Sequence, residues 1–301
     1  MMVQFRSLLA FLPLMLSSTA FLLPRQATTT QVYKFPSTAS IEGIGIRENG
    51  QILITRMDAG EIWQYDPTTK AAAKLISISG VTATAGIVEL APDVWYIVGG
   101  KYSGGANTAG SWGVYKLNLN GASPALSTVK VVPESKLWNG LTKLDNDTLL
   151  IGDAQAGSVF KMSASTGKYS AIITANSEMT PGGGIPFGLD GIRYYNGSLY
   201  FTNISKNTFS RVPIDASGKA GTVVKIYSNT PGDDLSFDSL GNAYVATNLQ
   251  NSVIKVDAAG KITKLATVSG STCTAFGRTE ATKNTLYVGG GSSVMSFPVT
   301  F

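Results

Sequence analysis

The chain of 301 residues contains no histidine and a single cysteine, Cys273. Without histidine, the sequence excludes Ser-His-Asp triads, histidine general bases and histidine metal ligands. One cysteine cannot form an intrachain disulfide, and with no histidine to activate it we interpret Cys273 as a small core residue. Acid–base or metal chemistry must therefore use Asp, Glu, Asn, Lys, Tyr or Arg.

Charged residues are also scarce, at 14% of the chain, and the net charge is +5. No cluster of basic residues accompanies that charge, which excludes nucleic acid as a partner. Long stretches of helical periodicity are lacking too. Short β-rich runs alternate instead with Gly, Asn, Asp and Pro, and the 33 glycines indicate many tight turns. This pattern predicts an all-β protein.

Residues 1–20 have the pattern of a secretory signal peptide. Arg6 supplies the positive start, residues 8–16 the apolar run, and Ser18-Thr19-Ala20 a small-residue cleavage site. The alternative is a membrane anchor, but the apolar run is short for a bilayer span and Pro13 interrupts it. We expect a secreted protein, or one in the secretory lumen, with no membrane anchor after cleavage.

The rest of the chain divides into a flexible N-terminal segment, residues 21–30, and one folded domain, residues 31–301. Secretion agrees with three N-glycosylation sequons, which begin at Asn146, Asn196 and Asn203. Nothing in the sequence indicates an oligomer, and we expect a monomer.

A repeated pattern organises the folded domain. Each unit has an acidic or amide residue, a short apolar strand, a turn with Gly, a second apolar strand and a polar residue. The units recur at intervals of about 40 to 50 residues, which is typical of β-propellers. The sixth unit ends without room for a fourth strand, and the strand at residues 32–35 can supply it. The sequence therefore predicts a six-bladed β-propeller closed by its N-terminal strand. The units begin at or near Glu42, Ala85, Asn139, Asp190, Asp234 and Thr274.

In an antiparallel blade, the residues just before the first strand and just after the second meet on one face. Because the innermost strands line the axis, we expect the polar residues at these positions to converge on a central pocket. The alternative is that Asp and Asn there only bond to their own turns. The candidate catalytic residues are Asp190, Asp153, Tyr102 and Arg56, and the candidate substrate-binding residues are Trp138, Phe187, Asn203, Asp234 and Asn248.

The motifs Glu42-Gly43, Asn139-Gly140-Leu141 and Asp190-Gly191 resemble those of the senescence marker protein/gluconolactonase/luciferin-regenerating-enzyme-like family. The resemblance implies that Glu42, Asn139 and Asp190 bind a divalent metal, for which oxygen ligands suit Ca²⁺. It also implies that Asp190 acts as a general base in lactone hydrolysis. A family substrate-binding Asn-Asp-Gly is replaced here by Thr84-Ala85-Gly86, a departure that disfavours a sugar lactone as substrate.

Other motifs are similar to a secreted fungal branch of that family, which includes hetero-Diels–Alderases of tropolone-sesquiterpenoid biosynthesis. This resemblance implies a cyclase that needs no cofactor and joins a quinone methide to a polyene, with a small hydrophobic substrate as partner. Two alternatives stay open: a lactone or ester hydrolase that uses Ca²⁺ or another divalent cation, and a binding propeller without catalysis. The motifs lie at residues 41–51, 191–203, 211–215, 233–234, 243–248 and 275–279.

Overall fold

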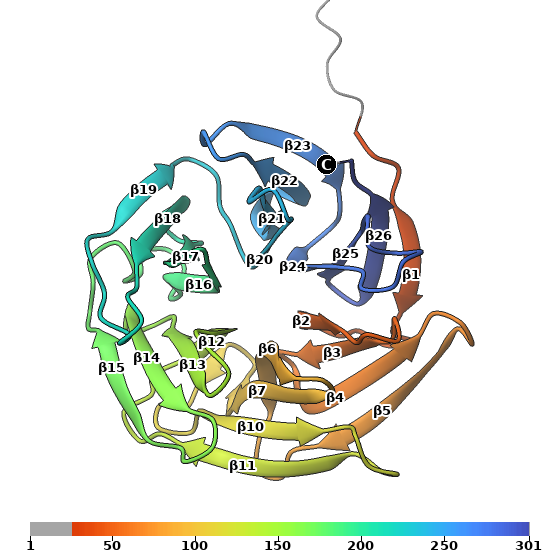
Figure 1. The fold of residues 1–301 in the computed structure, drawn as a ribbon, viewed down its shortest axis with the longest axis horizontal. Coiled ribbons are helices and arrows are strands. Elements are labelled where there is room, and N and C mark those ends of the chain that lie inside the picture. Colours follow the sequence, from red (N-terminus) through yellow and green to blue (C-terminus); the bar gives the residue numbers. More distant parts are fainter. Residues whose placement is uncertain (1–25, 301) are drawn as a thin grey trace, which may run out of the picture.

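The computed structural model describes residues 26–300 and shows six four-stranded antiparallel sheets arranged as blades around one axis (Figure 1). The predicted six-bladed β-propeller is confirmed. The only helical element among the described residues is one turn of 3₁₀-helix, η1 (Asn248–Gln250). No helix within residues 26–300 has the length and apolar character needed to cross a membrane. The predicted signal peptide lies outside the described residues.

Each blade runs outward from an inner strand at the axis to an outer strand at the rim. Blades 1 to 3 consist of β2 (Ile41–Ile46), β3 (Ile52–Arg56), β4 (Ala59–Asp66) and β5 (Ala71–Ser77); β6 (Ala83–Ala91), β7 (Val94–Gly100), β10 (Gly113–Asn118) and β11 (Ala125–Val131); and β12 (Trp138–Lys143), β13 (Thr148–Asp153), β14 (Ser158–Ser163) and β15 (Tyr169–Ile173).

Blades 4 to 6 continue around the ring, and a short hairpin projects from blade 2. Blade 4 consists of β16 (Leu189–Tyr195), β17 (Ser198–Asn203), β18 (Thr208–Pro213) and β19 (Val224–Tyr227); blade 5 of β20 (Leu235–Phe237), β21 (Ala243–Thr247), β22 (Ser252–Val256) and β23 (Ile262–Thr267); blade 6 of β24 (Ser271–Phe276), β25 (Thr285–Gly290), β26 (Ser293–Pro298) and β1 (Thr30–Lys34); and the hairpin of β8 (Tyr102–Ser103) and β9 (Ala106–Asn107).

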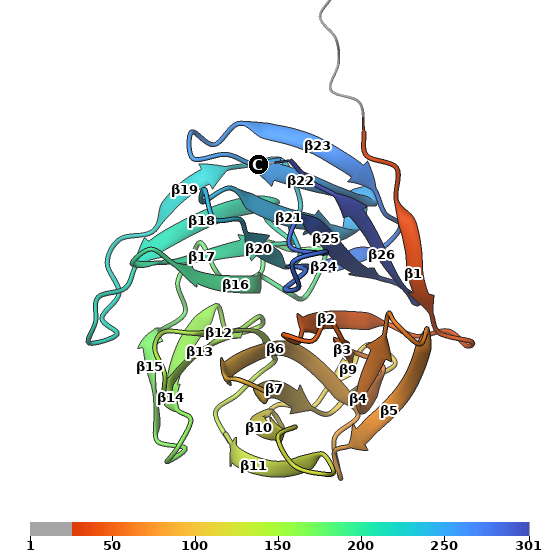
Figure 2. The same ribbon diagram turned by 45° about the vertical axis from the view of Figure 1, so that its right-hand side comes forward.

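The N-terminal strand closes the ring, as predicted. β1 pairs antiparallel with β26, the last strand of the chain, so that blade 6 is built from both ends of the sequence (Figure 2). Aromatic side chains also bind this end to blade 1: the Tyr33 ring stacks on Tyr65 at 5.1 Å, and the Phe35 ring meets Trp63 edge-on at 5.2 Å. Pairing of β1 with β26 thus completes the fourth strand of blade 6 and joins the two ends of the chain.

Glycines bring the inner strands of blades 1 to 5 together around the axis. Gly43, Gly86, Gly140 and Gly191 each face the backbone of the next blade. A Cβ added at Gly86 would lie 2.6 Å from the carbonyl oxygen of Asn139, and one at Gly140 would lie 2.5 Å from that of Asp190. Real Cβ atoms do not approach so closely, so only glycine permits this spacing of the strands.

Apolar side chains fill the spaces between neighbouring blades, and threonine hydroxyls add hydrogen bonds across the same boundaries. Thr55 of blade 1 donates to the carbonyl oxygen of Ala85 in blade 2 at 2.6 Å, and Thr272 of blade 6 donates to that of Ile41 in blade 1 at 2.8 Å. Cys273 is buried between blades 6 and 1, as expected for a core residue.

We expect Gly140→Ala to destabilise the propeller by about 2 kcal/mol or more, as overpacked core sites do, because its Cβ would press on the Asp190 backbone. Gly221→Ala is the matched control, since Gly221 is exposed and its added Cβ would have no heavy atom closer than 3.5 Å. Urea unfolding measures both variants. Equal free energies of unfolding would contradict the proposed role of close strand contact.

Candidate active site

Irregularities in the inner strands of blades 1, 3 and 4 each turn one polar residue toward the axis. The register of β2 with β3 shifts at Glu42, that of β12 with β13 shifts at Asn139 and Gly140, and that of β16 with β17 shifts at Asp190 and Gly191. A bulge of this kind re-aims a side chain that the regular pleat would place elsewhere. The glycines that follow allow the three strands to approach, and their polar neighbours meet at one end of the axis.

The result is a compact acidic cluster. Carboxylate oxygens of Glu42, Asp190 and Asp233 all lie within 4.8 Å of one another. The Asn139 amide nitrogen joins two of them: it donates to Glu42 Oε1 at 2.9 Å and to Asp190 Oδ1. Three carboxyl groups and one amide, contributed by four different blades, therefore share a single small volume.

Burial and mutual repulsion make these carboxyl groups weak acids. Burial raises the pKa of Glu42 to about 7, with a further increase from the charge of Asp234 and an opposing hydrogen bond from Asn139. Burial, followed by the charges of Glu42 and Asp234, raises the pKa of Asp190 well above its usual range. The same causes, with the charge of Asp190 added, raise the pKa of Asp233. The cluster can therefore hold protons near neutral pH.

Blade 5 contributes Asp233 to the cluster, whereas the sequence pattern had selected its neighbour, Asp234. The Asp234 carboxylate pairs with Arg193 of β16 at 2.5 Å. Arg193 also donates to the carbonyl oxygen of Ile192 at 2.7 Å, so this cation is held beneath the acidic cluster. Blade 5 has no glycine after its acidic residue to mark the register, and the Asp233-Asp234 doublet is the only sequence signal for this position.

The cluster forms the floor of an axial cavity of about 250 Å³. Its rim is apolar and comes from loops and strand ends, with Met57 after β3, Ile204 after β17 and Leu249 in η1. Tyr102 of the β8–β9 hairpin and Phe187 lie across the same rim with their rings 6.2 Å apart. The cavity thus combines proton-holding groups below with aromatic and aliphatic surface above.

Several predicted site residues do line this cavity. Tyr102, Phe187 and Asn248 lie on its wall, together with Glu42 and Asn139 on its floor. Asp190 also belongs to the floor. Apart from Asp233, the other lining residues have no signal in the sequence pattern; one of them, Ile185, follows the Gly182-Gly183-Gly184 run in the loop before β16. The unselected lining residues are Ser40, Met57, Leu137, Ile185, Ile204, Asp233, Leu249 and Thr272.

Five predicted site residues are not among those that line the cavity: Asp234, which pairs with Arg193, and the four described next. Arg56 pairs with Asp58 at 2.6 Å, and Asp153 accepts hydrogen bonds from the backbone amides of Lys136 at 2.7 Å and Ala156 at 2.9 Å. The Asn203 amide donates to the carbonyl oxygens of Glu178 and Thr180, both at 3.0 Å. Trp138 is fully buried in the core between blades 2 and 3.

Strand pairing explains why these side chains miss the cavity. Arg56 pairs with Ile41, Asp153 with Trp138, and Asn203 with Leu189. Cross-strand partners point to the same face of a sheet, and successive residues point to opposite faces. Ile41, Trp138 and Leu189 each stand one residue before a residue that faces the axis, namely Glu42, Asn139 and Asp190. Both members of each pair therefore face a neighbouring blade instead of the axis.

The sequons differ in accessibility. Asn146 and Asn196 are exposed, and Asn196 occupies a left-handed turn with φ of 44°. Asn203 is fully buried and its amide nitrogen is occupied by two hydrogen bonds. The folded protein therefore offers Asn146 and Asn196, but not Asn203, to a glycan.

The donor set of the floor fits a hard divalent cation. Carboxylate oxygens are the ligands that Ca²⁺ and Mg²⁺ prefer, and three of them converge within 4.8 Å. A cation there would offset the repulsion that raises the pKa values of Glu42, Asp190 and Asp233. The residues implied by the family resemblance, Glu42, Asn139 and Asp190, adjoin one another, and Asp233 extends the set.

Comparison with known proteins agrees with this architecture. No protein-family model matches the chain. It is 28% identical to a Phoma sp. protein named "Putative hetero-Diels-Alderase", over 86% of this chain and 85% of that protein. It is 25% identical to a Sarocladium schorii protein named "Putative hetero-Diels-Alderase asR5", over 86% of this chain and 77% of that protein. The predicted resemblance to this group is confirmed.

Solved structures share the fold at low sequence identity. A luciferin-regenerating enzyme superposes with a TM-score of 0.68 at 15% identity, covering 91% of this chain and 95% of that one. A calcium-binding regucalcin from Agrobacterium tumefaciens gives 0.66 at 16% identity, with 90% and 94% covered. A gluconolactonase from Xanthomonas campestris gives 0.66 at 10% identity, with 91% and 90% covered. The fold is thus that of the regucalcin- and gluconolactonase-like propellers.

In buffer with a chelator, we expect the free energy of unfolding to fall as the pH rises from about 4.5 to about 7. The Glu42 carboxyl binds its proton more tightly in the folded state than in the unfolded chain. The stabilisation that this proton contributes is therefore fully present below the unfolded pKa of Glu42, and it is lost as the pH rises through the folded pKa of about 7. The contribution of Glu42 is roughly 3 kcal/mol. Glu42→Gln should remove it, as urea unfolding at pH 5 and pH 8 would show.

Asp66→Asn is the control for this measurement. Hydrogen bonds from the Thr68 backbone and Gln51 lower the pKa of Asp66, which lies on a turn of blade 1 outside the axis. Its titration falls below the window, so this variant should keep the wild-type slope. A Glu42→Gln protein with an unchanged slope would contradict the assignment of the titration to the axial cluster.

Proposed function

We propose that the protein is a small-molecule enzyme whose axial cavity catalyses a hetero-Diels–Alder-type cyclisation between a quinone methide and a polyene terpene. The observation that carries the proposal is the division of one cavity into an acidic floor, with Glu42, Asp190 and Asp233, and an apolar rim, with Tyr102 and Phe187. The names of the two relatives at 28% and 25% identity support the same class of reaction.

The acidic floor supplies what the first chemical step needs. A protonated carboxyl of the cluster gives its proton to the hydroxyl group of a benzylic-type alcohol, the C–O bond breaks and water leaves. A neighbouring carboxylate accepts the phenolic proton, so the cluster ends with as many protons as it began with and the product is a neutral quinone methide. The raised pKa values of Glu42 and Asp190 keep a proton available near neutral pH.

The apolar rim supplies what the second step needs. Cycloaddition requires no covalent help from the protein, but it requires two reactants in a near-attack geometry and exclusion of the water that would otherwise add to the quinone methide. Met57, Ile204 and Leu249 offer aliphatic surface for a polyene, and Tyr102 and Phe187 offer aromatic faces. In blade 2, Ala85 stands where a polar side chain would extend the floor, so the cavity suits a substrate less polar than a sugar.

A metal-dependent lactone or ester hydrolase is the second candidate, and the convergence of three carboxylates favours it. Glu42, Asp190 and Asp233 would hold a divalent cation, which when bound polarises a carbonyl and activates water. The shared fold of the gluconolactonase agrees with this candidate.

We expect purified wild-type protein to convert a quinone-methide precursor and a polyene terpene to their cyclic adduct, as detected by mass spectrometry, in the presence of a chelator. Asp190→Asn and Glu42→Gln should each lower the rate by about 100-fold, the typical loss for a proton-transfer group. Asp66→Asn should retain the wild-type rate. Activity that requires added Ca²⁺, or an unaltered rate in both axial variants, would overturn the cyclase mechanism.

The hydrolase candidate makes a separate prediction. One equivalent of Ca²⁺ should bind in isothermal titration calorimetry, and Asp190→Asn should weaken that binding at least tenfold, because one of three clustered carboxylates is lost. Bound Ca²⁺ should also raise the free energy of unfolding at pH 8 more than at pH 5, where protons compete for the ligands. Absence of Ca²⁺ binding to the wild type would exclude a Ca²⁺-dependent hydrolase.

A further inference from the structure

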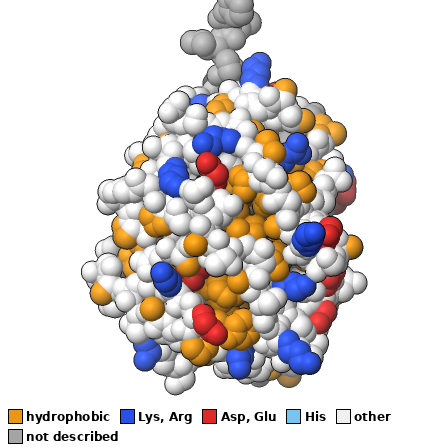
Figure 3. All heavy atoms as spheres, turned by 90° about the vertical axis from the view of Figure 1, so that its left-hand side faces the viewer, with side chains coloured by type: hydrophobic (Ala, Val, Ile, Leu, Met, Phe, Trp, Pro, Cys, Tyr) orange, Lys and Arg blue, Asp and Glu red, His pale blue; other side chains and the backbone are white. Residues whose placement is uncertain are grey.

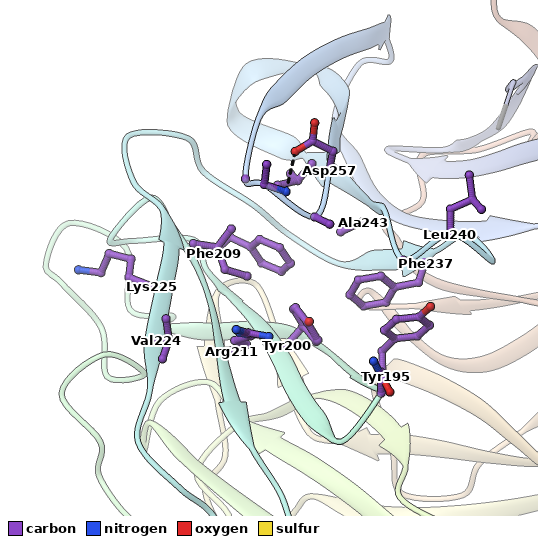
Figure 4. Close-up of a pocket in the computed structure, with 17 residues that line it drawn as sticks. Tyr195, Tyr200, Phe209, Arg211, Val224, Lys225, Phe237, Leu240, Ala243 and Asp257 are labelled. Carbon is purple, nitrogen blue, oxygen red and sulfur yellow. Dashed lines mark hydrogen bonds between the residues drawn. The ribbon is translucent and has the colours of Figure 1, made fainter.

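A second cavity, larger than the axial one, lies between blades 4 and 5 (Figure 4). Its volume is about 440 Å³, within the range of small-molecule sites, roughly 300 to 1,000 Å³. One wall comes from β16 to β19 and the other from β20, β21 and the turn between β22 and β23. None of its lining residues lines the axial cavity, so the two sites are separate.

A single small residue in blade 5 creates this cavity. Ala243 of β21 pairs with Val256 of β22. In every other blade the corresponding residue of the second strand is large and buried, and it packs against the preceding blade. These residues are Ile52, Trp95, Leu149, Leu199 and Leu286. Blade 5 also presents only small residues in the adjoining turn, residues 258–260. Volume that side chains fill elsewhere in the ring is therefore open here.

Aromatic rings from both blades form a continuous wall of the cavity: Tyr195, Tyr200 and Phe209 come from blade 4, and Phe237, the cross-strand partner of Ala243, comes from blade 5. The rings of Tyr195 and Phe237 stack at 4.5 Å with 14° between their planes, and Tyr200 meets Phe237 edge-on at 4.8 Å. Phe209 extends the wall, with its ring 5.9 Å from that of Tyr200. Because these rings fix one another, the wall is formed before any ligand arrives, and it can receive a planar ring by stacking.

One cation at this cavity has no ion-pair partner. Arg211 of β18 is exposed, and its side chain forms no hydrogen bond or ion pair with the residues that the structure describes. Lys225 beside it pairs with Glu178 at 3.1 Å. Asp257, across the cavity, accepts hydrogen bonds from the backbone of Ala259 and Lys261 in its own turn. The Arg211 guanidinium is therefore free to bind an anion from outside.

The outer surface agrees with this arrangement. Figure 3 looks at the side of the molecule on which blade 4 lies, and hydrophobic side chains gather there in hollows with separate Lys and Arg side chains at the margins. In Figure 4, Arg211 points into the space beside Tyr200 and Phe209, with Ala243 on the far side. An aromatic face and a cation thus border the same opening.

We propose that this inter-blade cavity, defined by Ala243, Arg211 and the rings of Tyr195, Tyr200, Phe209 and Phe237, binds a planar aromatic carboxylate. The ring occupies the volume that the small Ala243 side chain leaves open and stacks on the aromatic wall. The carboxylate pairs with the Arg211 guanidinium, whose planar fork matches a carboxylate with two parallel hydrogen bonds. The site is independent of the axial cavity and of the reaction proposed for it.

The test uses the purified full-length protein and 2-naphthoate as the probe, with neutral 2-naphthylmethanol as its uncharged counterpart. Isothermal titration calorimetry should show 2-naphthoate binding at one site, about tenfold more tightly than 2-naphthylmethanol, as expected when a charge-assisted pair is present. Equal affinity for the two probes would overturn the role of Arg211.

Two substitutions locate the binding. Ala243→Leu restores the residue size found in blades 3, 4 and 6, and it should weaken 2-naphthoate binding at least tenfold without unfolding the protein, because it fills the cavity. Arg211→Met keeps the aliphatic stem and should abolish the preference for the charged probe. Lys255→Met is the matched control, since Lys255 faces the Tyr244 ring and not this cavity, and it should bind as the wild type does.

Asp190→Asn separates this site from the axial one and should leave 2-naphthoate binding unchanged. If Asp190→Asn alters the binding and Ala243→Leu does not, the probe occupies the axial cavity and the proposal is wrong. If no variant changes the binding, the probe adheres non-specifically and the proposal is equally wrong. Thermal unfolding of each variant confirms that it is folded under the conditions of the titration.

Discussion

Close contact between the inner strands at the axis is the constraint on which the rest of this propeller depends. Gly43, Gly86, Gly140 and Gly191 let the backbone of one blade lie against the axial residue of the next. A side chain at any of them would force neighbouring blades apart. The same contact brings Glu42, Asn139 and Asp190, which precede three of the glycines, close together at one end of the axis. Strand spacing and site electrostatics therefore share one cause.

Crowding has a direct chemical consequence. Carboxyl groups brought within 4.8 Å of one another in a buried volume either keep protons or bind a cation. A cluster that keeps its protons can act as a general acid, and a cluster that binds a cation presents a Lewis acid. Either one can polarise an oxygen atom of a substrate at the start of a reaction. In the proposed reaction, Tyr102, Phe187 and their aliphatic neighbours supply the apolar surface on which the substrate binds. The two candidate functions thus differ in the state of one floor, which keeps protons in the cyclase and binds a cation in the hydrolase.

Blade 5 departs from the pattern of its neighbours in two ways. Its inner strand, β20, has only 3 residues and lacks the glycine that follows the axial residue in blades 1 to 4. As a result Asp233 faces the cluster while Asp234 is neutralised by Arg193. Its second strand carries Ala243 where the other blades carry large residues, which opens the cavity toward blade 4. Irregularity in the repeat of blade 5 thus coincides with a member of the acidic cluster and with the inter-blade cavity.

The sequence by itself determined the fold and three residues of the cavity floor, Glu42, Asn139 and Asp190. Six β-rich units, a missing last strand and an unpaired first one predict a closed propeller, and the pairs Glu42-Gly43, Asn139-Gly140 and Asp190-Gly191 mark its axis, because a glycine after a polar residue is a local signal. Only the tertiary structure decided which neighbours join them. Asp153 stands beside the axis in sequence but pairs with Trp138 and faces the next blade, since side-chain direction follows from strand register. The rim and the inter-blade cavity at Ala243 depend on contacts between residues of different blades, which no local sequence pattern records.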